Sequence, residues 1–262
     1  MPLKCNQKIS FFLFIFFSIS LIQNLSARGF KDNPEEQLFY SSIKENYNRK
    51  FFFEVHRLSQ QFIKNYPDSI RGSEVYYYLG ESESRFFKSI FYFRKVAQMA
   101  PNSFWAIKAQ LALALKYYAI GNYKKAELEF KNFITNYKAS KEILKAKYFR
   151  ALSLIQLKEL EQAKAILNEV SLEAPTSEWA LKSKESLGQI YYMNGEFSQS
   201  IDVYNIVLKE SKSDFVKAVT YEKLGISYIK TGQKSKGLEI FRKLISFYPN
   251  SDSAKRIKKI YF

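Results

Sequence analysis

Apolar residues recur at positions i, i+4 and i+7 through most of the chain, which is the spacing of one buried helical face. Each such face begins with a small residue, which is followed by two bulky ones. The small residues are Ser89, Ala126, Ala163, Ser200 and Gly237; the bulky ones are Phe93, Phe130, Leu167, Tyr204 and Phe241, and then Val96, Phe133, Val170, Val207 and Leu244. All three series advance by 37 residues, so the pattern predicts one helix in the same register of every 37-residue unit.

A second series of small residues predicts another helix in each unit. Its members, spaced by 34 and then by 37 residues, are Gly80, Ala114, Ala151, Gly188 and Gly225. A small side chain lets a neighbouring helix approach closely, so we expect these five residues, together with Ala126 and Ala163, to be the packing positions of the repeat. Gly121, Gly195 and Gly232 fall between the two series, where each pair of helices needs a tight turn.

Proline and short polar residues mark the link between one unit and the next. Pro101, Pro175 and Pro249 are each 74 residues apart, which is twice 37. Lys138 and Lys212 fill the slots between them, and Pro67 marks the first slot. Two residues after each such slot stands a residue expected to cap the next helix, because its side-chain oxygen can accept from the free N–H groups of the first turn. These residues are Ser69, Ser103, Ser140, Ser177, Asp214 and Ser251. The pattern predicts six helix pairs between about Pro34 and Tyr248, with Asn33 as the first cap, then a final helix over 252–261, and no strand.

These features resemble the tetratricopeptide repeat family, whose helix–turn–helix unit has 34 residues. The motif Leu187-Gly188-x-x-Tyr191, the spacing of Ala126 and Phe130, and the proline slot carry the resemblance. It covers about residues 67–250, with a divergent helix pair over 28–66 before it and a basic capping helix over 251–262 after it. The run Tyr66-Pro67-Asp68-Ser69 and the three extra residues per unit are similar to the envelope subgroup of the family. That subgroup includes the lipoprotein of the outer-membrane barrel assembly machine and the periplasmic partner of the Tol–Pal system.

The resemblance implies an all-α solenoid of about five to six repeats with one concave groove, which binds a peptide or a protein. In the family, four slots of the first helix of each pair line this groove. Those slots here include three lysines and three tyrosines, expected to form a basic, aromatic channel for a peptide with acidic and apolar side chains. They are Lys108, Lys145, Lys182, Tyr118, Tyr148 and Tyr192. The other groove slots hold Glu74, Val219, Tyr77, Leu111, Glu185, Glu222, Glu81, Leu115, Leu152, Gln189, Ile226, Ser84, Ile155 and Ile229. The alternative is that the lysines are solvated helix starts and the tyrosines pack inside the solenoid.

The first 27 residues have the pattern of a secretory signal peptide. Lys4 and Lys8 precede a 14-residue apolar run over 9–22, and Leu25-Ser26-Ala27 ends the segment with small residues. We therefore expect cleavage after Ala27 and an exported protein of the periplasm or cell envelope; the alternative is an uncleaved membrane anchor. Cys5 stands before the apolar run, whereas a lipoprotein signal needs its cysteine after it, so lipidation is not expected.

The charge of the chain is strongly basic and unevenly placed. Lys+Arg number 41 against 25 Asp+Glu, and residues 212–262 hold 12 basic and 4 acidic side chains. This excess reflects either lysines on solvated faces or a basic end that meets an acidic protein or the phosphate groups of a membrane surface. No base-reading motif is present, and nucleic acid is not an expected partner.

The sequence offers little for catalysis. Cys5 and His56 are the only residues of their kinds, and His56 is expected to be a solvated surface residue. We expect no enzyme, no metal, no cofactor and no small-molecule substrate. The expected function is a non-catalytic adaptor or scaffold of the bacterial cell envelope. The alternative is a membrane-associated structural envelope protein that uses its basic C-terminal end or an uncleaved N-terminal anchor.

Overall fold

The computed structural model describes residues 33–262, which form thirteen helices and no strand. The helices are α2 (Pro34–Asn48), α3 (Phe52–Asn65), α4 (Gly72–Ser82), α5 (Phe86–Met99), α6 (Phe104–Ala119), α7 (Tyr123–Asn136), α8 (Ile143–Gln156), α9 (Leu160–Glu173), α10 (Glu178–Met193), α11 (Phe197–Glu210), α12 (Asp214–Lys230), α13 (Lys234–Phe247) and α14 (Asp252–Tyr261). The predicted signal segment and its cleavage after Ala27 lie outside the described residues.

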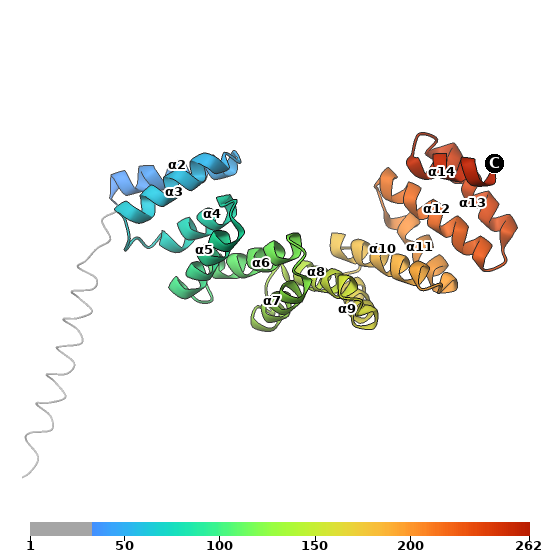
Figure 1. Cartoon of the computed structure of the whole chain (residues 1–262), viewed down its shortest axis with the longest axis horizontal. Helices are drawn as coiled ribbons and strands as arrows, with labels where there is room; N and C mark the ends of the chain where they lie inside the picture. The colour runs from blue at the N-terminus through green and yellow to red at the C-terminus, as the bar shows by residue number, and fades with distance from the viewer. Residues whose placement is uncertain (1–32) are drawn as a thin grey trace, which may run out of the picture.

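Each helix packs against the next, so the chain winds into a solenoid of six helix pairs and a terminal helix. Figure 1 shows the pairs following one another along an open arch. The first helices of the pairs, α4, α6, α8, α10 and α12, form its inner row, and α5, α7, α9, α11 and α13 form its outer row (Figure 1). The predicted all-α solenoid with a capping helix is confirmed.

The core between the two rows is made of the periodic residues. Phe93, Phe130, Leu167, Tyr204 and Phe241 are all buried, as is every member of the Val96 series. The small residues allow this packing: a Cβ added at Gly188 would lie 2.5 Å from the ring of Tyr204, well inside contact distance. Gly80 and Gly225 meet the corresponding aromatic rings in the same way. The alanines of the same packing series are fully buried, namely Ala114, Ala126, Ala151 and Ala163.

The turns inside the pairs use left-handed backbone. Gly121, Gly195 and Gly232 have φ of 76°, 77° and 81°, a region that glycine enters without steric cost. The slot between the first two, 37 residues from each, holds Lys158 with φ 67°. An L-residue other than glycine, asparagine or aspartate is rare there, so Lys158 holds a strained position in its turn.

Three of the six predicted N-caps are wrong. Ser103, Ser177 and Ser251 cap their helices, and each Oγ accepts from a backbone N–H three residues on at 3.1 Å. Ser69 and Ser140 instead lie in turns ahead of α4 and α8, where each Oγ accepts from the N–H two residues on. Asp214 is the first residue of α12, and Ser213 is its cap. The links ahead of α4 and α8 are longer than the one ahead of α6, so Ser69 and Ser140 lie before the helix start and not at it.

The inner row opens near its C-terminal end. Direct packing joins α4 with α6, α6 with α8, and α8 with α10, whereas α10 and α12 are held mainly by α11, which packs against both. The apolar core is divided accordingly: one cluster runs from Ile43 to Ala146, and separate clusters serve α8–α10, α11–α12 and α12–α14. The spacing of the inner helices is therefore widest between α10 and α12.

Candidate functional site: the inner face of the arch

Lys108 lies among aromatic rings on the inner row. Its Nζ is 4.8 Å from the ring centre of Phe104, 5.3 Å from that of Trp105 and 5.9 Å from that of Tyr77. An ammonium group is attracted by the negative face of such rings. Lys108 is therefore held by its own helix and by α4, and its ammonium sits above a floor of aromatic side chains.

Lys108 and Lys145 both interact with the charge of Glu81. Burial raises the pKa of the Glu81 carboxyl on α4, and the positive charges of Lys116, Lys108 and Lys145 oppose that rise. The Glu81 carboxylate interacts electrostatically with lysines of both α6 and α8, so these lysines lie on one surface. Tyr118 and Tyr148 lie in the same region, since Tyr148 contributes to the raised pKa of Tyr118, whose main cause is burial.

Lys145 and Lys182 also have partners on their own helices or at their starts. Lys145 Nζ is 3.9 Å from Glu142, and Lys182 forms an ion pair with Glu178 and lies 4.6 Å from the ring centre of Trp179. Trp179 in turn packs against Tyr148, with ring centres 5.6 Å apart. The three lysines thus follow the inner row, but each is partly neutralised where it stands.

Tyr192 belongs to a different part of the inner face. Its ring packs against Phe197 at 5.8 Å, and Lys223 Nζ lies 5.7 Å from its centre. The six residues predicted as one channel therefore fall into two regions. Lys108, Lys145, Tyr118 and Tyr148 gather on α6 and α8, Lys182 follows on α10, and Tyr192 lies beside α12.

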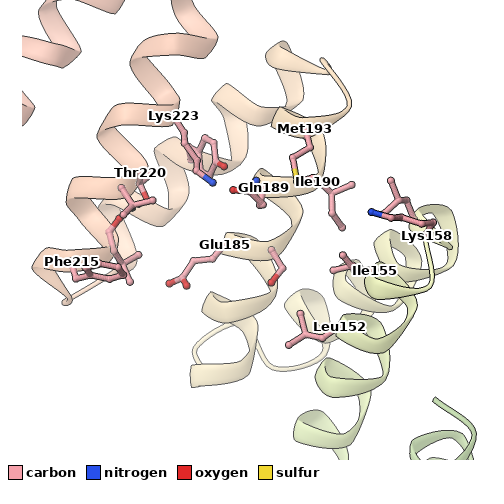
Figure 2. A pocket seen from close by; sticks show the side chains of 15 residues that line it. Leu152, Ile155, Lys158, Glu185, Gln189, Ile190, Met193, Phe215, Thr220 and Lys223 are labelled. Carbon is pink, nitrogen blue, oxygen red and sulfur yellow. Dashed lines mark hydrogen bonds between the residues drawn. The ribbon is translucent and has the colours of Figure 1, made fainter. Parts of the chain in front are cut away.

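Between α8, α10 and α12 the inner face carries a hollow of ≈ 390 Å³ (Figure 2). Its walls are mainly apolar, and they include Leu152, Ile155, Ile190, Met193, Phe215 and Val219. Phe215 is 79% exposed and Met193 is 68% exposed, although both are large apolar side chains that burial would stabilise. The hollow therefore offers an apolar surface that nothing in the described chain covers.

Polar groups stand around this hollow without charged partners. Burial raises the pKa of Glu185 and lowers the pKa of Lys223; the charges of Lys182 and Glu222, respectively, oppose these shifts. Among the described residues no oppositely charged group lies within 4 Å of Glu185, Lys223 or Lys158. In Figure 2 Lys223 reaches from α12 towards Gln189, and Glu185 points towards α12.

Tyr204 adds an unpaired hydroxyl to the wall. The residue is buried, and its Oη has no hydrogen-bond partner among the residues described. Burial also raises the pKa of Tyr204, so the phenol keeps its proton and remains a donor. A buried donor without an acceptor destabilises a fold unless something else supplies the acceptor.

Sequence reasoning placed five residues of this hollow in groove slots but did not single them out. These are Leu152, Ile155, Glu185, Gln189 and Val219. Phe215, Lys223 and Lys158 were missed. One signal was available, because Lys158 breaks the glycine series of the turns at a regular 37-residue position.

His56 is not the solvated surface residue that was expected. Its side chain is 21% exposed, its Nε2 lies 3.8 Å from Oε2 of Glu83, and its buried Nδ1 has no hydrogen-bond partner. Glu83 is itself buried and accepts from the backbone N–H and the guanidinium of Arg85. These hydrogen bonds, against the effect of burial, lower the pKa of Glu83 to about 2. The group is an ion-pair network at the junction of α3, α4 and α5.

Residues 33–262 lack two further features. No helix there is long and apolar enough to cross a membrane. No cluster of three or more His, Cys, Asp or Glu side chains there could hold a metal ion.

Two family models match parts of the chain. A model described as an outer membrane lipoprotein, YfiO, matches residues 82–161, and a tetratricopeptide repeat model matches residues 220–251. A search of curated proteins gave no match.

Solved structures share the fold at low sequence identity. A tetratricopeptide repeat protein from Parabacteroides merdae is 15% identical, with 82% of this chain and 80% of that chain covered and a TM-score of 0.63. PilW, a type IV pilus biogenesis factor, is 11% identical over 86% of this chain and 99% of its own, with a TM-score of 0.62. MamA from Desulfovibrio magneticus is 15% identical over 69% and 97%, with a TM-score of 0.57. By its repeat, its helix packing and these matches, the chain has the tetratricopeptide repeat fold, with family-model matches over residues 82–161 and 220–251.

Proposed function

We propose that this chain is a non-catalytic scaffold of the bacterial cell envelope, which holds a peptide or protein partner on the inner face of its arch. The observation that carries the proposal is the uncovered apolar hollow on that face, bordered by unpaired charges. Exposed apolar surface of this kind marks interaction sites in soluble proteins. A row of parallel helices also offers one continuous surface to an elongated partner.

The envelope is supported by the matched family and by the N-terminal pattern. The YfiO model describes an outer membrane lipoprotein, and PilW is a pilus biogenesis factor. The basic start, the apolar run and the small residues before Arg28 have the order of a secretory signal. An exported, periplasmic or envelope location follows from the two together, with an uncleaved anchor as the alternative.

Site-specific photo-crosslinking in cells tests the inner face as the binding surface. A photoreactive amino acid at Gln189 lies on the inner row, and one at the exposed Asn132 on α7 serves as the outer-row control. We expect a discrete protein adduct from Gln189 that is absent from Asn132. Equal adducts from both, or an adduct from Asn132 alone, would assign the partner to another face.

A membrane-associated role is the second candidate, favoured by the terminal helix. On α14 the side chains of Lys258 and Lys259 are exposed beside Ile260 and Phe262, which are also exposed. Basic residues interleaved with apolar ones suit a surface of anionic lipid. Lys255 and Arg256 are paired with Asp252 and Glu222, which leaves fewer free cations on this helix than the sequence suggests.

A further inference from the structure

We propose that the hollow between α8, α10 and α12 is a socket for a large apolar side chain of a partner peptide, next to which the peptide carries an acidic residue. The inference rests on the proposed function and names the chemistry of the partner. The hollow of ≈ 390 Å³ lies within the range of about 300–1,000 Å³ that is usual for ligand sites. It opens to the inner face, where a polypeptide has access.

The apolar part of the partner follows from the walls. The last turn of α8, the second half of α10 and the first half of α12 present aliphatic and aromatic side chains to one space. Phe215 and Met193 stand at its edge and are largely exposed. A leucine, methionine or phenylalanine side chain entering from the groove would cover both of them.

The acidic part follows from the position of the charges. In Figure 2 the ammonium groups of Lys158 and Lys223 both lie towards the Met193 end of α10, and Glu185 lies nearer its start. Neither lysine has a carboxylate of the described chain within 4 Å. A carboxylate next to the apolar side chain would pair with them, and the buried hydroxyl of Tyr204 offers a further donor.

The side chain of Lys158 reaches over the hollow towards Ile190 (Figure 2). Its backbone, with φ 67°, is a feature of the turns and not of the hollow, because Lys50 has φ 60° at the same slot of the first pair and glycine occupies the slot in three other units.

A display selection tests the socket directly. Random 12-residue peptides on phage are selected on the full-length immobilised protein, and the enriched peptides are then measured against variants by fluorescence anisotropy. Val219→Trp fills the hollow, and Asn132→Trp places the same side chain on the exposed outer row, away from the inner face. Circular dichroism establishes that each variant keeps the helical content of the wild type.

We expect the enriched peptides to share a large apolar residue with Asp or Glu within about three positions. Their binding should weaken at least about tenfold in Val219→Trp and change less than about twofold in Asn132→Trp. The double change Lys158→Glu and Lys223→Glu should weaken it similarly, and replacing the acidic residue of the peptide by Lys should restore it. This exchange of charges tests the acidic contact without requiring that a tryptophan fit into the hollow.

Three results would overturn the socket, and they separate it from the proposed function. Enriched peptides that lack an apolar residue, or that bind Val219→Trp normally but lose affinity for Lys108→Glu, would keep the peptide groove and exclude the hollow. Failure to enrich any peptide would remove the peptide-binding function as well. Binding of a fluorescent C16 fatty acid that Val219→Trp abolishes, without peptide enrichment, would make the occupant a lipid chain.

Discussion

At the scale of single residues, the steric demands of a tightly packed repeat explain most of its small positions. The ring of Tyr204 occupies the space where a side chain at Gly188 would begin. We expect Gly188→Ala to destabilise the protein by ~1–3 kcal/mol, because overpacking forces a buried aromatic ring to move. Thermal unfolding followed by circular dichroism measures it. An unchanged Tm would mean that Tyr204 moves freely, contrary to its burial.

At Lys158 a substitution by glycine is expected to stabilise the protein. A left-handed conformation costs an L-residue roughly 1–2 kcal/mol, and glycine avoids it while losing about 0.5–1 kcal/mol through greater unfolded-state freedom. Lys158→Gly should therefore stabilise the chain by ~0.5–1 kcal/mol. The reverse change in an equivalent turn, Gly195→Lys, should destabilise it by a similar amount. Urea unfolding measures both, and a loss of stability in Lys158→Gly would show that the lysine side chain itself supports the turn.

Glu83 gives the fold a defined pH dependence. Its folded-state pKa of about 2 lies below the ordinary value of 4.5, so its contribution to stability is fully present above pH ~5 and is lost as pH falls towards 2. After a discount for the 60% exposure of the Arg85 side chain, this contribution is on the order of 2 kcal/mol at neutral pH.

We expect Glu83→Gln to be destabilised at pH 7 and the gap from the wild type to narrow by ~1 kcal/mol between pH 6 and pH 3.5. Unfolding by urea at each pH measures this gap. Glu54→Gln removes an exposed carboxylate that pairs with Arg57 and should change stability little. A gap that stays constant with pH would show that Glu83 is not the titrating group.

At the scale of helices, the sequence predicts where helices form, but it does not distinguish a serine that caps a helix from a serine in a turn. Helix existence followed from a periodicity that each helix carries alone, since the residues at i, i+4 and i+7 must be buried on one face. The N-caps at Ser103 and Ser177 could also be predicted from the local sequence. Ser69 and Ser140 stand at the same slot of the repeat, but their hydroxyls accept within the link, because the following helix begins three residues later.

This difference has a measurable consequence. Ser177→Ala should cost ~1 kcal/mol, since the N–H of Ala180 loses its acceptor at the start of α10. Ser140→Ala should cost less, because its partner is a turn N–H near solvent, and the exposed Ser198 should be nearly neutral. Chemical unfolding of the three variants orders them. Equal losses at Ser177 and Ser140 would mean that the link, not the cap, provides the stabilisation.

At the scale of the whole molecule, the arch was predictable and the hollow was not. The order of six pairs and a basic terminal helix follows from the repeat, because each unit buries its face only against its neighbours. The hollow depends on how far α12 stands from α10. That distance is set by the packing of α11 behind them, which the 37-residue period does not specify. The candidate lysines lie on α6, α8 and α10 of the inner row, while the uncovered apolar surface could be found only from the structure.

The final prediction separates the inner face from the basic end as the partner's binding surface. Changing Lys108, Lys145 and Lys182 to Glu should leave helicity and Tm nearly unchanged, because the ion pairs of Lys145 and Lys182 are partly exposed, at 30% and 39% for the two lysine side chains, and such pairs contribute little to stability. The same change should weaken binding of acidic peptides and remove its salt sensitivity, since attraction to the peptide becomes repulsion. The matched variant changes Lys255, Lys258 and Lys259 of α14 to Glu. It should bind these peptides normally and lose only cosedimentation with vesicles of anionic lipid. If the α14 variant loses peptide binding while the inner-row variant keeps it, the partner binds the basic end, and the inner face serves the solenoid alone.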